Sequence, residues 1–140
     1  MYLLDTNILS ELIKKHPNPH LIERIRSQLS DSLFTSCVCV MELRMGSALR
    51  KDFNVFWDRI DKEILSTVGI IPIGMDEAMT AGDILASLRK SGKILGIEDV
   101  LIAASAITHG FTVVTANVRH YIRIKSLKVE NWLQIPSYNH

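Results

Sequence analysis

The sequence has little cysteine and no pattern of zinc ligands. Cys37 and Cys39 are the only two cysteines in 140 residues, and the five histidines are scattered without metal-ligand spacing. The two cysteines are two positions apart, so in a strand both would face the same side, and we expect buried thiols rather than ligands. A disulfide or a structural zinc ion is therefore not expected to hold this fold together.

The sequence also lacks a charge excess and a long apolar run. Lysine and arginine number 16 against 15 aspartates and glutamates, so the net charge is +1 and a nucleic-acid partner would need a local group of basic residues. No apolar run approaches the roughly 18 residues of a membrane span, and the N-terminus has no basic segment ahead of an apolar one. We expect a cytoplasmic protein that does not associate with membranes.

What the chain does have is a regular alternation of short and long apolar segments. The short segments, expected as strands, are Tyr2 to Leu4, Leu33 to Ser36, Val68 to Ile73, Phe111 to Thr115 and Lys128 to Trp132. The longer segments, expected as helices, are Ile8 to Lys15, His20 to Leu29, Val40 to Arg50, Phe53 to Ser66, Asp76 to Lys90 and Glu98 to His109. The pattern predicts a single α/β domain over residues 1–140, with a parallel sheet of four to five strands and helices on both faces.

Polar residues follow the predicted strands at positions that one edge of such a sheet would share. Asp5-Thr6-Asn7 follows the first strand, Glu42 lies in the first turns after the second, and Thr115 and Asn117 leave the fourth. Asp99 opens the helix that leads into the fourth strand, and that helix is apolar on nearly every face. Because ligands bind beyond the carboxyl ends of parallel strands, these side chains are expected to converge.

Each carboxylate also has a structural explanation. Asp5 could cap the next helix, and Asp99 could complement a helix dipole. Glu42 could form an ion pair, although Cys39 stands where a capping box requires serine or threonine. Together, however, converging carboxylates repel one another unless a cation lies between them, and an oxygen-only ligand set favours Mg²⁺ or Mn²⁺. Phosphate esters are natural substrates of such a site.

Four blocks in order resemble the PIN-domain ribonuclease family, and specifically the VapC-like toxins of bacterial toxin–antitoxin pairs. The blocks are Leu4-Asp5-Thr6-Asn7; Met41-Glu42-Leu43 with Gly46 and Ala48; Gly92 and Gly96 followed by Asp99-Val100-Leu101-Ile102-Ala103-Ala104; and Thr115-Ala116-Asn117 with Arg119, Tyr121 and the ending Leu127-Lys128-Val129-Glu130-Asn131-Trp132. The similarity covers nearly the whole chain.

The resemblance implies a metal-dependent endoribonuclease with Asp5, Glu42 and Asp99 as catalytic, metal-binding carboxylates. Its supporting polar shell would be Thr6, Asn7, Thr115 and Asn117. Many relatives have a further acidic residue at the position of Asn117 or near that of His120, which this chain lacks, so a second metal ion is in doubt. Glu98 could substitute, but its side of the helix argues against it. Since no catalytic histidine is required, activity is expected to survive His120→Ala and to fail in Asp5→Ala.

The resemblance further implies Mg²⁺ or Mn²⁺ as cofactor, structured RNA such as tRNA or rRNA as substrate, a homodimer, and a cognate antitoxin covering the acidic site. Basic residues that could follow an RNA backbone include Lys90, Lys93 and Arg119, with Arg89, Arg123 and Lys125 nearby in sequence. Each of these is also an ordinary solvated charge. Met41, Met45, Phe53, Phe56 and Trp57 offer apolar material for an interface or for the core.

Three other functions remain open. A PIN-like module without catalysis could bind RNA or a protein partner, as the missing fourth acid suggests. A receiver-like phosphorylation switch would need an aspartate at the end of the third strand, where this chain has Pro72-Ile73-Gly74-Met75. Cleavage of DNA also remains possible, because an acidic metal site does not by itself exclude deoxyribose.

Overall fold

The structure is a computed structural model in which residues 1–135 are described, and its centre is one parallel sheet. The strands are β1 (Tyr2–Leu4), β2 (Leu33–Ser36), β3 (Gly69–Ile71), β4 (Thr112–Val114) and β5 (Val129–Glu130). They are arranged in the order β3-β2-β1-β4-β5, and every pair of neighbours is parallel. The predicted α/β class and five-stranded parallel sheet are confirmed, although β3, β4 and β5 are shorter than expected.

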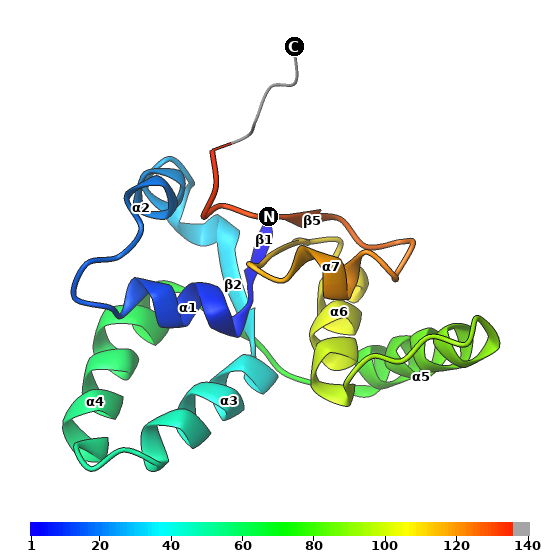
Figure 1. Cartoon of the computed structure of the whole chain (residues 1–140), viewed down its shortest axis with the longest axis horizontal. Helices are drawn as coiled ribbons and strands as arrows, with labels where there is room; N and C mark the ends of the chain where they lie inside the picture. The colour runs from blue at the N-terminus through cyan, green and yellow to red at the C-terminus, as the bar shows by residue number, and fades with distance from the viewer. Residues whose placement is uncertain (136–140) are drawn as a thin grey trace.

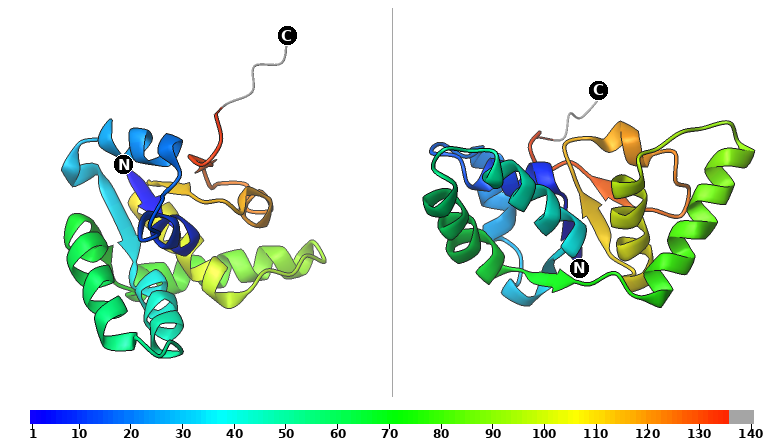
Figure 2. Two further views of the ribbon diagram at one scale, coloured as in Figure 1. Left: turned by 60° about the vertical axis from the view of Figure 1, so that its left-hand side comes forward. Right: turned by 90° about the horizontal axis from the view of Figure 1, so that it is seen from below.

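Helices connect the strands and cover both faces of the sheet (Figures 1 and 2). They are α1 (Thr6–Leu12), α2 (Pro19–Arg26), α3 (Cys37–Ala48), α4 (Phe53–Arg59), α5 (Met75–Lys90), α6 (Ile97–His109) and α7 (Val118–Tyr121). None of the helices in the described part of the chain combines the length and the apolar character of a membrane span. Figure 1 shows α1, α3 and α4 on one side of β1, and α5, α6 and α7 on the other.

The order in which strands are added to the sheet reverses between β1 and β4. From β1 the chain proceeds to β2 and β3 on one side, whereas from β4 it proceeds to β5 on the other. Such a reversal leaves a crevice beyond the carboxyl ends of the two central strands, where ligands bind in open α/β sheets. The centres of these two strands are fully buried, with Leu3 and Val113 both 0% exposed. The rigid centre of the sheet therefore positions whatever follows β1 and β4.

Helix α6 is buried on nearly all sides, as its composition predicted. Val100, Ile102 and Ala104 are each 0% exposed. The helix ends at Gly110, whose φ of 71° is the left-handed conformation that glycine adopts most easily. Because α6 packs between α5 and the sheet, the residues of its first turn have a fixed position.

The predicted helix over residues 53–66 is divided into three parts. An α-helix is followed by the π-helix η2 (Ile60–Ile64) and the 3-10 helix η3 (Leu65–Thr67). Ile60, Ile64 and Leu65 are all buried. A wider π turn lets residues four and five positions apart face the core together, which a regular α-helix does less well. The short α7 and the 3-10 turn η1 (Ser30–Ser32) were also not predicted.

The two cysteines are in a helix rather than in a strand. Ser36 ends β2 and immediately caps α3, because its Oγ accepts a hydrogen bond of 3.1 Å from the Val38 N–H. Cys37 therefore opens α3 and is half-buried, whereas Cys39 is fully buried. The same early start places Glu42 in the second turn of α3, which excludes a capping-box role for it.

Candidate active site

Asp5 lies at the reversal point between β1 and β4. It directly follows β1, and its backbone N–H continues the sheet by donating to the Val114 carbonyl at 2.9 Å. Only 4% of the residue is exposed. Thr115, directly after β4, is fully buried beside it and donates its hydroxyl to Asp5 Oδ2 at 2.8 Å. The two central strands thus deliver a carboxylate and a hydroxyl to one point.

The oxygens of Asp5 accept four hydrogen bonds. Oδ1 accepts from the Thr6 N–H at 2.8 Å, so Asp5 does cap α1. Oδ2 accepts from Thr115 and also from Asn7 Nδ2 at 3.4 Å and the Tyr121 hydroxyl at 3.2 Å. These contacts hold the carboxylate in one orientation. Asp5 therefore caps α1 and also lies at the carboxyl end of the sheet, the two positions that the sequence left as alternatives.

Glu42 reaches the site from α3. Its Oε1 accepts a hydrogen bond of 2.7 Å from the Thr6 hydroxyl, so Thr6 connects the two carboxylates, one through its N–H and one through its side chain. Among residues 1–135, Glu42 forms no ion pair with a lysine or an arginine. The simplest structural explanation for this acid is therefore absent in the described part of the chain.

Asp99 approaches from the first turn of α6 and is joined to Asp5 through Tyr121. The Tyr121 hydroxyl lies 3.4 Å from Asp99 Oδ1 and 3.2 Å from Asp5 Oδ2. The second oxygen, Asp99 Oδ2, is 3.5 Å from His120 Nδ1. Thr6 and Tyr121 thus link the three predicted carboxylates into one cluster.

Similarity to known proteins agrees with this geometry. The family model described as the PIN domain matches residues 2–125. The chain belongs to the PIN domain family. A VapC ribonuclease of Sinorhizobium fredii, Y4jK, is 36% identical over 120 residues, covering 82% of this chain and 86% of the relative. The tRNA(fMet)-specific endonuclease VapC of Salmonella typhimurium is 30% identical over 133 residues, covering 94% of this chain and 97% of the relative.

A solved structure shares the whole architecture. This chain superposes with a TM-score of 0.86 and 31% sequence identity on one chain of VapBC2 from Rickettsia felis. That structure was solved with VapBC2 bound to a DNA fragment from its promoter. The match covers 94% of this chain and 98% of the other. The resemblance to VapC-like PIN domains that the four sequence blocks indicated is confirmed.

Electrostatic repulsion disfavours ionisation of all three carboxylates, Asp5, Glu42 and Asp99, when no cation lies between them. Burial raises the pKa of Asp5, and although hydrogen bonds from Thr115, Thr6 and Tyr121 oppose the rise, the charge of Asp99 adds to it. Burial likewise raises the pKa of Glu42, and the charges of Asp5, Asp99 and Glu98 raise it further. The site therefore holds carboxylates that repel one another.

Glu98 influences the site electrostatically, although its side of the helix suggested that it would take no part. It is exposed, yet its negative charge contributes to the raised pKa of the Glu42 carboxyl. Its position next to Asp99 explains this influence, because electrostatic effects between charges reach well beyond hydrogen-bonding distance. Glu98 adds to the negative field of the crevice without contacting Asp5.

A divalent cation fits this arrangement. Donor atoms of Asp5, Cys39 and Glu42 lie within 4.8 Å of one another. Burial, and next the charge of Asp5, raises the pKa of the Cys39 thiol to about 11, so it is neutral at pH 7 and a poor ligand for a hard ion. The available donors are carboxylate oxygens, which suit Mg²⁺ or Mn²⁺, and a cation would relieve their mutual repulsion.

The predicted supporting residues differ in what they contribute. Asn7 Nδ2 donates to Thr115 Oγ1 at 3.2 Å, and Asn7 Oδ1 accepts from the Ala116 N–H at 2.9 Å, so Asn7 ties the turn after β4 to the site. Asn117 is exposed and supplies its backbone N–H to Thr115 Oγ1 at 3.0 Å. Its side chain does not cap α7. Asn117 therefore supports the site through its backbone N–H rather than through its side chain.

Sequence reasoning did not assign a role to Tyr121. Tyr121 is fully buried, and burial together with the charges of Asp5 and Asp99 raises the pKa of its hydroxyl far above the usual value, so it remains a hydrogen-bond donor. Tyr121 appeared in the fourth block, but nothing local to it indicated a contact 116 positions away.

The basic residues predicted to contact RNA, Lys90, Lys93 and Arg119, are all exposed. Exposure is expected both of residues that contact RNA and of ordinary solvated charges, so it does not distinguish the two.

A cavity of about 540 Å³ opens from the site between α1, α3 and α4. Thr6 and Glu42 line it together with apolar side chains that include Ile13, Leu43 and Ile60. Phe56 also lines it and is half-buried there, whereas Met41 and Met45 on α3 are 53% and 61% exposed. The apolar residues considered for an interface therefore divide between this cavity and the open surface.

Proposed function

We propose that this PIN domain protein is a Mg²⁺-dependent endoribonuclease that acts in the cytoplasm as the toxin of a toxin–antitoxin pair, with Mn²⁺ as a possible substitute. The observation that carries the proposal is the buried Asp5 carboxylate, which lies beside Glu42 and shares the Tyr121 hydroxyl with Asp99. Named ribonuclease relatives, and the family match over residues 2–125, support treating residues 1–140 as one nuclease domain.

Asp5, Asp99 and Glu42 are the proposed catalytic carboxylates. When bound, the ion supplies charge neutralisation at the scissile phosphate and activation of water. Thr6, Thr115 and Asn7 hold Asp5 in its orientation, and Thr6 sets Glu42 where it can bind the ion or orient the attacking water. In-line attack would leave a 5′-phosphate and a 3′-hydroxyl.

Structured RNA is the proposed substrate class. The Salmonella typhimurium relative is named for cleavage specific to tRNA(fMet), which makes tRNA the first substrate to test, with rRNA next. Because structured RNA is recognised mostly through its shape and its backbone, shape is expected to determine the target.

The proposed partners are a cognate antitoxin and a second copy of this chain. The related VapBC2 structure contains a toxin with its partner, and the apolar cavity between α1, α3 and α4 ends at Glu42, where an antitoxin segment would block the site. Exposed Met41 and Met45, one turn apart on α3, support a homodimer. Light scattering of the antitoxin-free protein tests the second proposal, and a monomer at micromolar concentration would contradict it.

Cleavage of purified RNA tests the main proposal. Antitoxin-free protein is incubated with total tRNA or rRNA in Mg²⁺, in Mn²⁺ or in EDTA, and fragments are separated on a denaturing gel. Asp99→Asn should reduce the rate by about a hundredfold or more, because it removes one charge from the metal site. Asp76→Asn is the matched control, because Asp76 is an exposed acid in the first turn of α5, away from the site.

The outcomes separate the alternatives. Fragments that need a divalent ion, persist in Asp76→Asn and vanish in Asp99→Asn would support the nuclease. If folded wild type and Asp99→Asn are equally inert, the non-catalytic binding module moves ahead, and the missing acid at Asn117 and His120 becomes its explanation. Cleavage of DNA but not RNA would contradict the proposed substrate class.

A further inference from the structure

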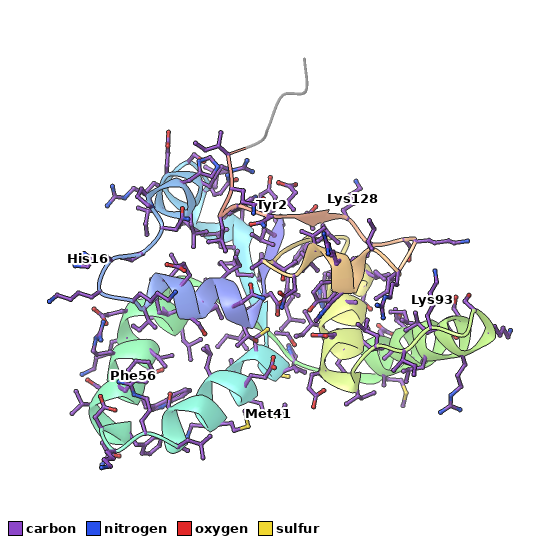
Figure 3. The ribbon with its side chains drawn as sticks, in the orientation of Figure 1. Tyr2, His16, Met41, Phe56, Lys93 and Lys128 are labelled. Carbon is purple, nitrogen blue, oxygen red and sulfur yellow. The ribbon has the colours of Figure 1, made fainter. Side chains whose placement is uncertain are left out.

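A second groove lies away from the acidic site, between α5 and the segment that follows α7. Its volume is about 470 Å³. Figure 2 shows this segment passing beside α5 in the view from below, and Figure 3 labels Lys93 beyond the end of α5. The groove is lined by Thr80, Asp83, Ile84, Ser87, Leu88, Ser91, Lys93, Ile107, Arg123, Ile124, Lys125 and Ser126. It is a separate concave surface, because it shares no lining residue with the cavity beside Glu42.

The groove has an apolar floor and polar, basic walls. Ile84, Leu88 and Ile124 are between 5% and 8% exposed and close the bottom. Hydroxyl groups come from four lining residues, namely Thr80, Ser87, Ser91 and Ser126. Its charged lining residues are three cations, Lys93, Arg123 and Lys125, and one acid, Asp83. Lysine, arginine and hydroxyl side chains are the usual partners of phosphate oxygens.

The groove is physically connected to the candidate active site. Arg123 donates a hydrogen bond to the Ile94 carbonyl, which joins the segment after α7 to the connection between α5 and α6. That connection leads directly into the turn of α6 that carries Asp99. Arg123 also follows Tyr121 by two positions, and Tyr121 contacts both Asp5 and Asp99. The segments that line the groove are therefore linked to the segments that carry Asp99 and Tyr121.

We propose that this groove binds the phosphate backbone of the RNA substrate outside the cleavage site. The inference rests on the proposed function and extends it. The whole protein carries a net charge of only +1, so RNA must be held by a local group of cations. Basic residues also line the cavity beside Glu42, but three of them, Lys14, Arg50 and Arg59, are already paired with acidic side chains. The groove gathers three such cations around hydroxyl donors. An acidic peptide is the less favoured occupant, because the four hydroxyls match phosphate oxygens and the enzyme already acts on a polyanion.

Neutralising Asp83 should change RNA affinity in the opposite direction to neutralising the lysines of the groove. It is the one acid lining the groove, it is exposed, and it would lie close to bound phosphates. Removing its charge should tighten RNA binding, whereas removing Lys93 and Lys125 should weaken it. A variant that is merely destabilised cannot bind more tightly, so the pair of results distinguishes a binding surface from a folding effect.

Binding is measured with labelled tRNA in an Asp99→Asn background, where the RNA is not cut. Lys93→Gln/Lys125→Gln should bind about tenfold more weakly, and the slope of log affinity against log salt should become shallower by roughly 1.4 to 1.8, because two phosphate contacts are lost. Lys51→Gln/Lys62→Gln makes the same charge change on exposed residues outside the groove. Asp83→Asn should bind about two- to threefold more tightly, with Asp61→Asn as its control.

Cleavage by otherwise wild-type protein gives an independent measurement. Lys93→Gln/Lys125→Gln should raise KM for full-length tRNA and leave kcat nearly unchanged, because these residues do not contact the scissile phosphate. The double variant should cut a tetranucleotide at the wild-type rate, because so short a substrate has few phosphates outside the scissile bond. Failure of the wild type to bind or cut any RNA would defeat the proposed function along with this inference.

Other results would overturn the inference alone. If the wild type cuts tRNA while the groove double variant binds it with the affinity and salt slope of the Lys51/Lys62 control, the groove does not contact RNA. Asp83→Asn binding no more tightly than Asp61→Asn would lead to the same conclusion. If a glutamate-rich peptide binds the groove in competition experiments and tRNA does not displace it, the occupant is an acidic peptide.

Discussion

At the scale of single residues, the site depends on one hydroxyl shared between two carboxylates. Tyr121 has one proton to donate and lies within 3.4 Å of both Asp5 Oδ2 and Asp99 Oδ1. That proton is donated to only one of these two oxygens at a time, and the other oxygen of each acid, Asp5 Oδ1 and Asp99 Oδ2, does not contact the hydroxyl. This arrangement fixes how two negatively charged groups present themselves to a cation.

We predict that Tyr121→Phe weakens binding of Mn²⁺ by about ten- to a hundredfold, the usual effect of losing a group that orients metal ligands. Calorimetric titration measures the affinity directly. Tyr2→Phe is the matched control, because Tyr2 packs edge-on against Trp132 at 4.8 Å between ring centroids, away from the carboxylates. Rates should recover in Tyr121→Phe at saturating metal. An unchanged Mn²⁺ affinity would reduce the hydroxyl to a packing role.

At the scale of elements, the edge strand β3 depends on a glycine. A Cβ at Gly69 would lie 2.5 Å and 2.7 Å from ring atoms of Phe34 on the neighbouring β2. Phe34 cannot easily retreat, because its ring packs against Phe111 at 4.7 Å between centroids. The close approach of β3 to β2 therefore requires a residue without a side chain at this position.

Gly69→Ala is expected to lower the free energy of unfolding by about 1–3 kcal/mol through overpacking. Gly82→Ala should raise it by roughly 0.5–1 kcal/mol, because Gly82 lies within α5 and an added Cβ meets nothing within 4 Å. Urea unfolding followed by circular dichroism measures both. Stabilisation by Gly69→Ala would mean that β3 and Phe34 adjust freely, and the argument for a constrained edge would be wrong.

At the scale of the whole molecule, the acidic site links stability to pH and to metal. The pKa values of Asp5 and Glu42 are raised on folding, so the folded state holds these protons more tightly than the unfolded state. Their favourable contribution is fully present below the unfolded pKa values and is lost as the pH rises through the folded ones. At neutral pH without metal, the site therefore lowers the stability of the protein.

Glu42→Gln should accordingly raise the free energy of unfolding in EDTA at pH 7, and the gain should disappear as the pH falls to the ordinary carboxyl range. Mg²⁺ at about a hundred times its Kd should stabilise the wild type by about 2.7 kcal/mol and the variant by less. Thermal unfolding over a pH series, with and without Mg²⁺, checks both signs. A loss of stability in EDTA at pH 7 would show that Glu42 is a structural acid.

Much of the architecture could be predicted locally. β1 and β2 match their predicted bounds, because each is an apolar run that ends at a polar residue able to cap the following helix: Asp5 for α1 and Ser36 for α3. The π turn at Ile60–Ile64 could not be predicted, because it depends on which side chains the core accepts. Cys37 and Cys39 were assigned strand geometry for the same reason, since their helix begins where the sheet ends.

The sequence by itself determined the fold class and the family and predicted the three carboxylates, because these depend on apolar periodicity and on short blocks of neighbouring residues. The tertiary structure decided what those residues contact. Thr6 meets Glu42 and Tyr121 meets Asp5 only after the sheet has brought segments 36 and 116 positions apart together. The basic groove between α5 and the segment after α7 likewise exists only in the folded chain, since local pattern carries no information about which distant charges will share a surface.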